Sequence, residues 1–230
     1  MRSSFYSPTE GKILAVHKPA DWTSFDVVNK IRRLTGIKKV GHAGTLDPFA
    51  TGVLLICLGP ATKKSASLMN LDKEYRAEIV LGQERDTMDV TGKVIAEAAV
   101  PELDIAGVDA ALQSFIGRIE QEIPAYSAAK HQGKRLYKLA RAGKEVPRLY
   151  KQVEIDEIER LSLEKDRLSI RVVCGKGTYI RTLARDIARK LGTAGYVNTL
   201  VRTRVGDYHL ADAMTIEAVQ AAMKSTEVSQ

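Results

Sequence analysis

Cysteine is scarce in this sequence, which has two cysteines in 230 residues and no Cys-x-x-Cys pair. Cys57 and Cys174 both lie in apolar runs, so we expect reduced thiols buried in the core, as is usual for proteins of the cytoplasm. Histidine is also rare, and the four histidines are scattered without the paired spacing of metal ligands. These shortages favour a cytoplasmic protein and argue against a metal enzyme.

Long apolar segments are missing as well. No run approaches the length of about 18 residues that suggests a membrane-spanning helix, and residues 1–10 lack the apolar stretch of a secretory signal. We therefore expect neither secretion nor membrane insertion, and no membrane partner. The sequence also lacks a Gly-x-x-x-x-Gly-Lys-Ser/Thr motif, which argues against a P-loop nucleotide site.

Acidic residues are outnumbered by basic ones, with 28 Asp and Glu against 35 Lys and Arg, a net charge of +7 and a pI near 9.3. This balance suits a polyanionic partner, although such an excess is equally typical of an ordinary solvated surface. The excess of basic residues is concentrated in residues 130–151, where Glu145 is the only acidic residue and two tyrosines lie among the cations. Because dense cations neutralise phosphates and aromatic rings stack on bases, we expect RNA-backbone contacts from Lys130, Lys134, Arg135, Lys138 and Arg141. The alternative is a plain surface helix with a loop.

Short strands and helices are mixed along the chain without a repeating βαβ period. Alternating apolar and polar residues predict strands over residues 72–81 and 167–174. Residues 12–17 also fit a strand, and the continuous apolar run 53–58 predicts a buried strand. Helical spacing follows three expected N-caps, namely Ser24, Asp104 and Thr178. Strands joined by hairpins and flanked by helices indicate an α+β fold with a mixed, mostly antiparallel sheet.

The segment from Gly41 to Leu54 holds a single carboxylate, Asp47, among three glycines and a proline, just before the predicted strand 53–58. Glycines let the backbone approach a ligand or adopt a positive φ, and Pro48 stiffens the turn. An aspartate on a tight loop at a strand edge is placed for chemistry. The alternative is a structural aspartate that bonds its own backbone in the turn.

This segment resembles the corresponding motif of the TruB-type tRNA pseudouridine synthases. Further motifs follow in that family's order over roughly residues 11–217: Lys18-Pro19, Thr23-Ser24, Lys73-Glu74-Tyr75-Arg76, Asp86-Thr87-Met88-Asp89, Ala125-Tyr126-Ser127-Ala128, Gly133-Lys134-Arg135-Leu136-Tyr137 and Gly177-Thr178-Tyr179-Ile180-Arg181. The resemblance implies the pseudouridine synthase fold with a central cleft, and an enzyme that isomerises the uridine at position 55 in the T stem-loop of tRNA. We expect the enzyme to need no cofactor, and no protein partner is implied.

The resemblance also suggests roles for individual residues. Asp47 matches the family's catalytic aspartate, which attacks either the uracil ring or the sugar. A carboxylate covered by a base is easily protonated, so Arg181 is expected to hold Asp47 bidentately. Alternatively, Arg181 is an ordinary solvent-facing arginine of the predicted helix, like Arg185 or Arg189.

The remaining site residues concern the flipped-out base. Tyr75 matches the tyrosine that stacks on the target ring, although its strand pattern also fits a core tyrosine. Tyr179 and Leu200 match residues that line the uracil pocket. His42 matches a residue that contacts displaced nucleotides of the T loop, whereas a lone histidine is more often structural.

We expect residues 1–230 to form one catalytic domain, with the basic insertion at about 124–152 acting as a mobile thumb. The sequence departs from the family pattern at Asp21, where a glycine is usual, at Arg85 and Val201, where a threonine and an arginine are usual, and at Ile123, where a proline is usual. It also ends at Gln230, without the C-terminal RNA-binding domain that many members carry, so contacts to the acceptor stem are expected to be reduced.

Two other functions fit parts of the sequence. Gly44-Thr45-Leu46-Asp47-Pro48 superficially resembles the opening of a nucleotidylyltransferase, but the His-x-Gly-His that this chemistry needs does not follow. A non-catalytic RNA-binding module or RNA chaperone is the second alternative. The combination of Asp47, Tyr75 and Arg181 argues against binding alone.

Overall fold

The computed structural model describes residues 6–227 and divides into two compact units. Unit 1 comprises Met1–Tyr75 and Val201–Gln230, and unit 2 comprises Arg76–Leu200. Strands β4 (Lys73–Leu81) and β12 (Gly195–Val205) each contribute residues to both units. Unit 2 is therefore an insertion in the sequence of unit 1.

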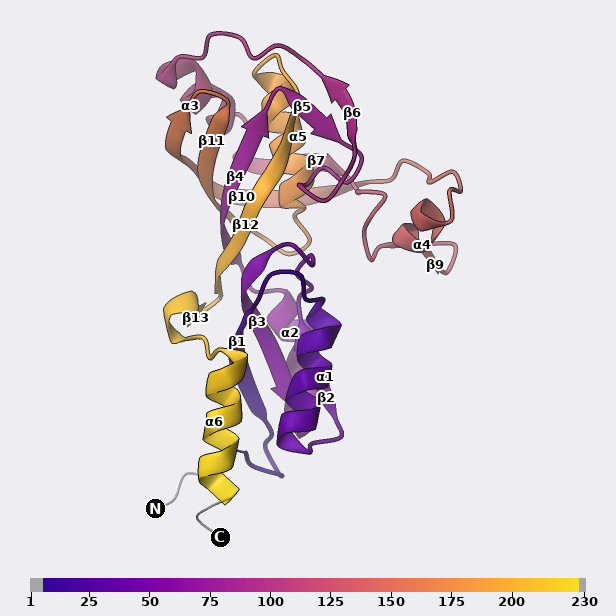
Figure 1. Ribbon diagram of the computed structural model, residues 1–230, viewed down its shortest axis with the longest axis vertical. Helices are drawn as coiled ribbons and strands as arrows, with labels where there is room; N and C mark the ends of the chain where they lie inside the picture. The colour runs from indigo at the N-terminus through magenta and orange to yellow at the C-terminus, as the bar shows by residue number, and fades with distance from the viewer. Residues whose placement is uncertain (1–5, 228–230) are drawn as a thin grey trace. The chain divides into compact units, whose positions relative to one another are not determined.

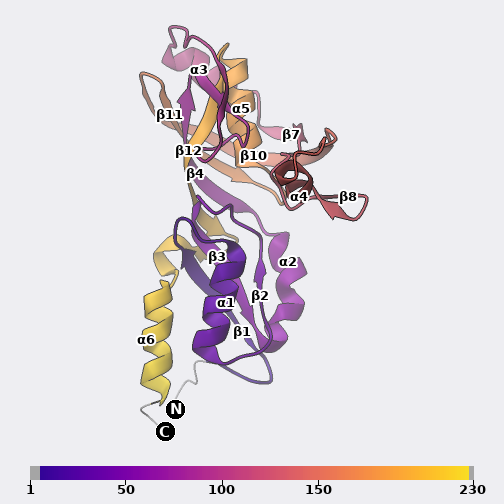
Figure 2. The same ribbon diagram turned by 45° about the vertical axis from the view of Figure 1, so that its right-hand side comes forward.

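Unit 1 is built on the strands β1 (Lys12–Lys18), β2 (Val40–Ala43) and β3 (Thr51–Leu58). β3 pairs antiparallel with β1 and β2 and parallel with the end of β12. α1 (Ser24–Thr35) and α6 (Ile216–Glu227) pack on one face of β1 and β3, while η1 (Gly59–Lys64) and α2 (Ser65–Met69) cover the other face (Figure 2). The alternation of the strands explains both cores, because successive side chains of β3 point to opposite faces and all are buried from Gly52 to Leu58.

The two ends of α1 follow from local sequence. Thr23, not Ser24, is the N-cap, because its backbone is extended and its side chain forms a capping box with Asp26. The prediction of Ser24 as the cap was therefore wrong by one residue. Gly36 ends the helix in the left-handed conformation with φ 67°, as predicted.

Unit 2 contains a sheet in the order β12-β4-β11-β10-β7, with β7 (Gly117–Glu122), β10 (Tyr150–Glu164) and β11 (Arg167–Cys174) (Figure 1). β10 pairs antiparallel with β7 and β11. β5 (Gln83–Arg85) and β6 (Val94–Glu97) form a separate two-stranded sheet in unit 2. The short elements β13 (Tyr208–His209) and η2 (Leu210–Asp212) follow β12 in the chain and belong to unit 1. These strands, with few helices beside them, confirm the predicted α+β fold, whereas the central cleft stays a prediction.

The helices of unit 2 test the other two predicted caps. Asp104 caps α3 (Ile105–Gln113) by accepting the amide of Gly107 at 2.7 Å, as predicted. Thr178 does not cap α5 (Ile180–Lys190), which begins after Tyr179. The Thr178 hydroxyl donates to the Gly175 carbonyl instead, at 3.2 Å.

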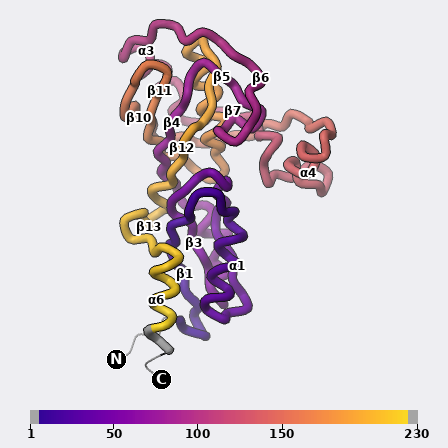
Figure 3. Tube along the Cα trace, viewed as in Figure 1, coloured from indigo at the N-terminus to yellow at the C-terminus, as the bar shows by residue number. Residues whose placement is uncertain are grey.

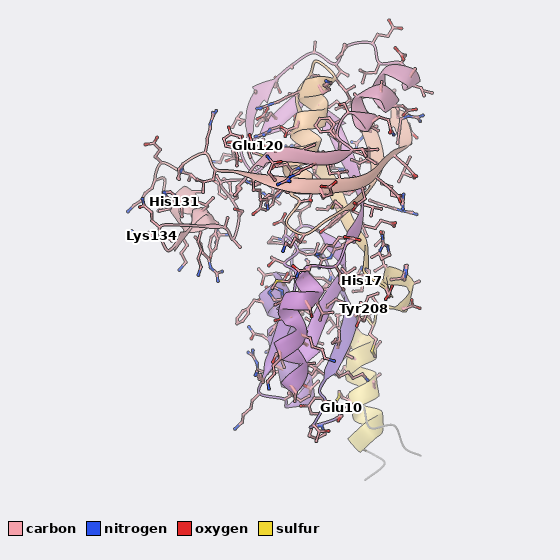
Figure 4. All side chains as sticks on the ribbon, turned by 180° about the vertical axis from the view of Figure 1, so that it is seen from behind. Glu10, His17, Glu120, His131, Lys134 and Tyr208 are labelled. Carbon is pink, nitrogen blue, oxygen red and sulfur yellow. The ribbon has the colours of Figure 1, made fainter. Side chains whose placement is uncertain are left out.

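The predicted thumb region leaves the sheet after β7 and returns into β10 (Figure 3). We call residues 124–149 the basic arm. It contains the hairpin strands β8 (Lys130–His131) and β9 (Lys134–Arg135), followed by α4 (Leu136–Arg141). His131 and Lys134 face each other across this hairpin (Figure 4). The Ile123 amide donates to the Leu149 carbonyl at 2.7 Å and closes the base of the arm, a bond that the family's usual proline cannot make.

Two expectations about the whole chain can be compared with the fold. Cys57 and Cys174 are buried, as predicted, and neither forms a disulfide within residues 6–227. Burial raises the pKa of Cys57. None of the helices within residues 6–227 is long and apolar enough to cross a membrane.

Candidate active site

Asp47 lies half-buried on the loop that joins β2 to β3. We call residues 44–50 the Asp47 loop. Gly44 and Gly52 flank the aspartate with φ values of 88° and 108°, which a residue with a side chain adopts only under strain. Two of the three glycines that marked this segment in the sequence are therefore required by the backbone of the turn.

Ser24 fixes the residue before Asp47. The Leu46 amide donates to the Ser24 hydroxyl oxygen at 2.9 Å, and this hydroxyl is 3.2 Å from the Leu46 carbonyl that it can donate to. The Ala50 amide donates to the Asp47 carbonyl at 3.2 Å. The buried serine that fails as a helix cap thus connects α1 to the Asp47 loop.

Lys18 holds the other side of the loop. Its side chain is fully buried, and its Nζ donates to the carbonyls of Pro48 at 2.9 Å, Pro19 at 2.8 Å and Trp22 at 2.6 Å. Burial lowers the pKa of Lys18 to about 8, although the charges of Asp21 and Asp47 partly oppose this shift. The ammonium is therefore a buried cation close to the proposed nucleophile.

Asp21 stands where the family usually has a glycine, and its backbone shows why a glycine is usual there. Its φ of 63° lies in the left-handed region, where glycine is the least strained residue. Its amide also donates to the Pro48 carbonyl, at 2.9 Å. Asp21 therefore keeps the contact of this turn with the Asp47 loop.

Arg202, on β12, is a second buried cation that contacts the Asp47 loop, and it comes 157 residues after Thr45 in the chain. It is 1% exposed and donates to the carbonyls of Gly44 and Thr45 at 3.0 and 3.4 Å. Sequence reasoning assigned no role in the site to Ser24, Lys18 or Arg202. A charged residue in a β-rich segment is the only mark of Arg202 in the sequence, and Arg204 carries the same mark without contacting the loop carbonyls.

His42 and Tyr75 also belong to unit 1. His42 lies on β2, and its buried Nδ1 has no hydrogen-bond partner within residues 6–227. Burial lowers the pKa of His42, and the positive charge of Arg202 lowers it further, so both favour the neutral imidazole. Tyr75 lies on β4 with 8% of its surface exposed, which fits both a core tyrosine and a stacking residue.

Arg181 belongs to unit 2, in the first turn of α5. Its guanidinium donates to the carbonyls of Thr87 at 2.8 Å and Tyr126 at 3.0 Å, and it lies 3.5 Å from the buried carboxylate of Asp89. The solvent-facing alternative for Arg181 is therefore wrong. The predicted bond to Asp47 joins the two units and stays a prediction.

The other two arginines of α5 differ from Arg181 in their partners. Arg185 is buried but bonds Glu122 at 2.8 Å, and Arg189 is exposed and bonds Glu84 at 2.8 Å. Of these three arginines, only Arg181 contacts the buried carboxylate of Asp89, which belongs to the motif Asp86-Thr87-Met88-Asp89. This contrast separates the three arginines, which spacing alone did not.

Tyr179 is held from two sides within unit 2. Its backbone exchanges two hydrogen bonds with the buried amide of Gln121, at 3.0 and 3.3 Å. The Lys151 ammonium lies 3.9 Å from the centre of the Tyr179 ring and donates to the Gly177 carbonyl. Leu200, the last residue of unit 2, is 6% exposed.

The five cations expected to contact the RNA backbone lie on the basic arm and are largely exposed, namely Lys130, Lys134, Arg135, Lys138 and Arg141. Within residues 6–227 none of them forms an ion pair with an acidic side chain; Arg141 instead lies 5.6 Å from the ring centre of Tyr137. Their charge is therefore available to a polyanion. Arg85, another departure from the family, is occupied by the carbonyls of Val90 and Gly92.

Comparison with known proteins places this arrangement in a family. Residues 32–180 match the model described as TruB family pseudouridylate synthase (N terminal domain), and residues 181–229 match the model described as tRNA pseudouridylate synthase B C-terminal domain. The chain belongs to the TruB family. It is therefore an isomerase, a pseudouridine synthase that acts on uridine in tRNA. The expectation that residues 1–230 act as one catalytic domain stays a prediction.

Curated relatives agree over nearly the whole chain. "tRNA pseudouridine synthase B" of Phocaeicola vulgatus is 46% identical over 227 residues, covering 96% of this chain and 97% of the relative. The protein of the same name from Desulfotalea psychrophila is 48% identical over 209 residues, covering 88% of this chain and 85% of the relative.

Solved structures show the same fold at lower identity. An H/ACA RNP bound to a substrate RNA containing 2'-deoxyuridine holds a chain that matches with a TM-score of 0.72 and 24% identity, covering 97% of this chain and 56% of that one. An archaeal box H/ACA sRNP Nop10-Cbf5 complex matches with a TM-score of 0.70 and 24% identity, covering 96% of this chain and 56% of that one. At this identity the likeness supports the fold alone.

Proposed function

We propose that this protein converts the uridine at position 55 in the T stem-loop of tRNA to pseudouridine, with Asp47 as the nucleophile. The observation that carries the proposal is the Asp47 loop, whose backbone is held by hydrogen bonds on both sides of the aspartate. A nucleophile must meet the reacting atom within a few tenths of an ångström, and such anchoring supplies that precision.

The reaction breaks the bond from the ribose to a base nitrogen, turns the uracil, and forms a new bond from the ribose to a ring carbon. Asp47 adds to the ring or traps the sugar cation, and its bond to the substrate breaks again before the product leaves. The ring carbon that joins the ribose loses its proton, and the freed ring nitrogen takes up a proton. No electrons are gained or lost overall, so the reaction needs no redox cofactor. Tyr75 stacks on the flipped-out base and assists loss of the proton from the ring carbon.

Other residues act on binding and charge. Arg181 supplies a permanent cation to Asp47, whereas Tyr179 and Leu200 line the uracil pocket. His42 contacts nucleotides of the T loop. The exposed cations of the basic arm neutralise phosphates of the stem, and the protein works in the cytoplasm, where tRNA is modified.

The test is turnover of tRNA transcripts labelled with tritium at carbon 5 of uridine. The purified protein should release tritium from a full-length transcript and from a T-arm stem-loop, and chemical mapping should place one pseudouridine at position 55. A transcript with cytidine at position 55 is the matched control and should release none. Binding of tRNA without any release would instead identify an RNA-binding module, and release from a different uridine would refute the site.

A further inference from the structure

Arg202 is an arginine buried without a carboxylate partner among the described residues 6–227. Its hydrogen-bond acceptors within residues 6–227 are three main-chain carbonyls: Val53 at 2.7 Å from Nε, Gly44 at 3.0 Å from Nη2 and Thr45 at 3.4 Å from Nη1. Burying a guanidinium costs free energy that a close carboxylate normally offsets. The burial of the Arg202 guanidinium therefore needs a reason other than pairing with a negative charge.

The three carbonyls lie at the two ends of the Asp47 loop. Gly44 and Thr45 precede Asp47, whereas Val53 follows the loop on β3. A planar guanidinium with donors in a fixed fork can hold both ends at once. A shorter or single-headed side chain cannot reach carbonyls on both sides in the same geometry.

The main chain of Arg202 restrains the same segment. Arg202 pairs with Gly52 where β12 runs parallel to β3. A Cβ atom on Gly52 would lie 2.2 Å from the Arg202 carbonyl oxygen and 2.7 Å from its nitrogen. Gly52 must therefore be a glycine because the backbone of Arg202 lies against it, and the end of the loop has a fixed position relative to β12.

We propose that Arg202 is a positioning residue that holds the Asp47 loop at both ends and so sets the place of the Asp47 carboxylate. The inference rests on the proposed function, in which Asp47 is the nucleophile. Arg202 touches neither the base nor the sugar. It acts through the loop, and a displacement of the reacting atom by about 1 Å is enough to lower a rate on the order of 100-fold.

The positive charge of Arg202 acts on two titratable residues near the Asp47 loop, and this effect can be measured separately from the reaction rate. It lowers the pKa of His42 and contributes to the lowered pKa of Lys18. Removing the charge should therefore raise the pKa of His42. Exposure of His42 in a loosened fold would also raise this pKa, because burial lowers it, so thermal unfolding of the same variant is measured to separate the two causes.

The experiment compares Arg202→Met and Arg202→Lys with wild-type protein. Arg204→Met is the matched control, because Arg204 lies two residues further along β12 and donates to the Gly206 carbonyl at 3.1 Å, away from the Asp47 loop. Single-turnover tritium release from tRNA at saturating enzyme gives the rate of the chemical step. Filter binding gives the tRNA Kd, thermal unfolding gives the folded fraction, and NMR gives the titration of His42.

We expect Arg202→Met to lower the single-turnover rate of the folded enzyme at least about 100-fold, with the tRNA Kd within about threefold. Arg202→Lys should recover part of the rate, and Arg204→Met should match wild type. The pKa of His42 should rise in Arg202→Met and rise less, or not at all, in Arg202→Lys.

A rate within about threefold of wild type for Arg202→Met would overturn the proposal. If Arg202→Met does not fold, Arg202→Lys decides: an unchanged rate refutes positioning by the fork, and a rate lowered about tenfold at unchanged Kd supports it. Wild-type turnover is measured first in the same assay. A wild-type protein without turnover would refute the proposed function itself, whereas active wild-type protein with fully active variants would refute only the role of Arg202.

Discussion

The Asp47 loop and the basic arm are both irregular segments between strands, but their backbones are held in different ways. In the Asp47 loop every carbonyl from Gly44 to Pro48 accepts a hydrogen bond, and most of the donors come from residues distant in the sequence. In the basic arm the backbone hydrogen bonds mostly join residues close in the sequence, within the hairpin and α4. For example, the Leu136 amide donates to the Ala129 carbonyl, and the Ala142 amide donates to the Lys138 carbonyl. The cations of the arm are largely exposed.

This difference matches two physical requirements. Bond making needs a group held in one geometry before the substrate arrives, because mobility of the nucleophile lowers the rate. Phosphate neutralisation needs charge density rather than fixed geometry, since the interaction acts over several ångströms. The contrast predicts that changes in the loop alter the chemical step, whereas changes in the arm alter binding and its dependence on salt.

The largest effect is expected for Asp47→Asn, which keeps the shape of the side chain and removes its charge. Tritium release should be abolished, while the tRNA affinity stays within about tenfold, or about 1.4 kcal/mol, because binding is spread over many phosphates and bases. Measurable pseudouridine formation by a pure preparation of this variant would rule out Asp47 as the nucleophile and remove the basis of the comparison.

Arg181→Met should come next, because it removes the cation proposed to face Asp47. It also removes the cation beside the buried carboxylate of Asp89, which then keeps its hydrogen bonds from Thr87 and Thr91. Loss of the cation from a buried ion pair is expected to destabilise the fold by up to about 3–5 kcal/mol. Arg181→Lys keeps the charge but loses the planar fork, so it should retain part of both activity and stability. Urea unfolding and single-turnover rates of the two variants are the measurements, and equal rates for Lys and Met would show that charge is not the contribution of Arg181.

A smaller and different effect is expected when Lys134, Arg135 and Lys138 of the basic arm are replaced by alanine together. Binding should weaken, and the slope of log Kd against log salt should flatten by about 0.9 for each phosphate that the variant no longer neutralises. The single-turnover rate at saturating enzyme should change little. The control replaces Lys93 and Lys190, which are exposed cations of unit 2 outside the arm; a salt slope that falls equally in both would mean that the arm is only a solvated surface.

The smallest effect is a pH dependence of stability from Lys18. Its pKa in the folded protein is about 8, below the ordinary value of 10.5, so between these values the unfolded chain binds more protons. The contribution of Lys18 to the free energy of unfolding should therefore rise with pH in this window, by at most about 1.4 kcal/mol per pH unit. The measurement is the free energy of unfolding of wild type and of Lys18→Met, from chemical denaturation between pH 7 and about 10.5. A difference in this free energy that stays constant over the whole pH range would show that the pKa of Lys18 is not lowered.

Much of the fold could be predicted because it is encoded locally. The alternation in residues 72–81 and 167–174 predicted the strands β4 and β11, and Gly36 and Asp104 marked a helix end and a helix start correctly. The failures were also local. At Ser24 and Thr178 a neighbouring residue took the cap position, because a hydroxyl that finds a better partner elsewhere does not cap its own helix.

The motifs of the sequence identify the family and the Asp47 loop, because its glycines, its aspartate and its proline all lie within one short segment. The hydrogen bonds that hold this loop become visible only in the folded chain. Ser24, Lys18 and Arg202 reach its carbonyls from 22, 30 and 157 residues away in a chain whose local pattern gives no sign of these hydrogen bonds. The physical reason is that a buried donor has to find an acceptor wherever the packing brings one close, and packing is a property of the whole fold.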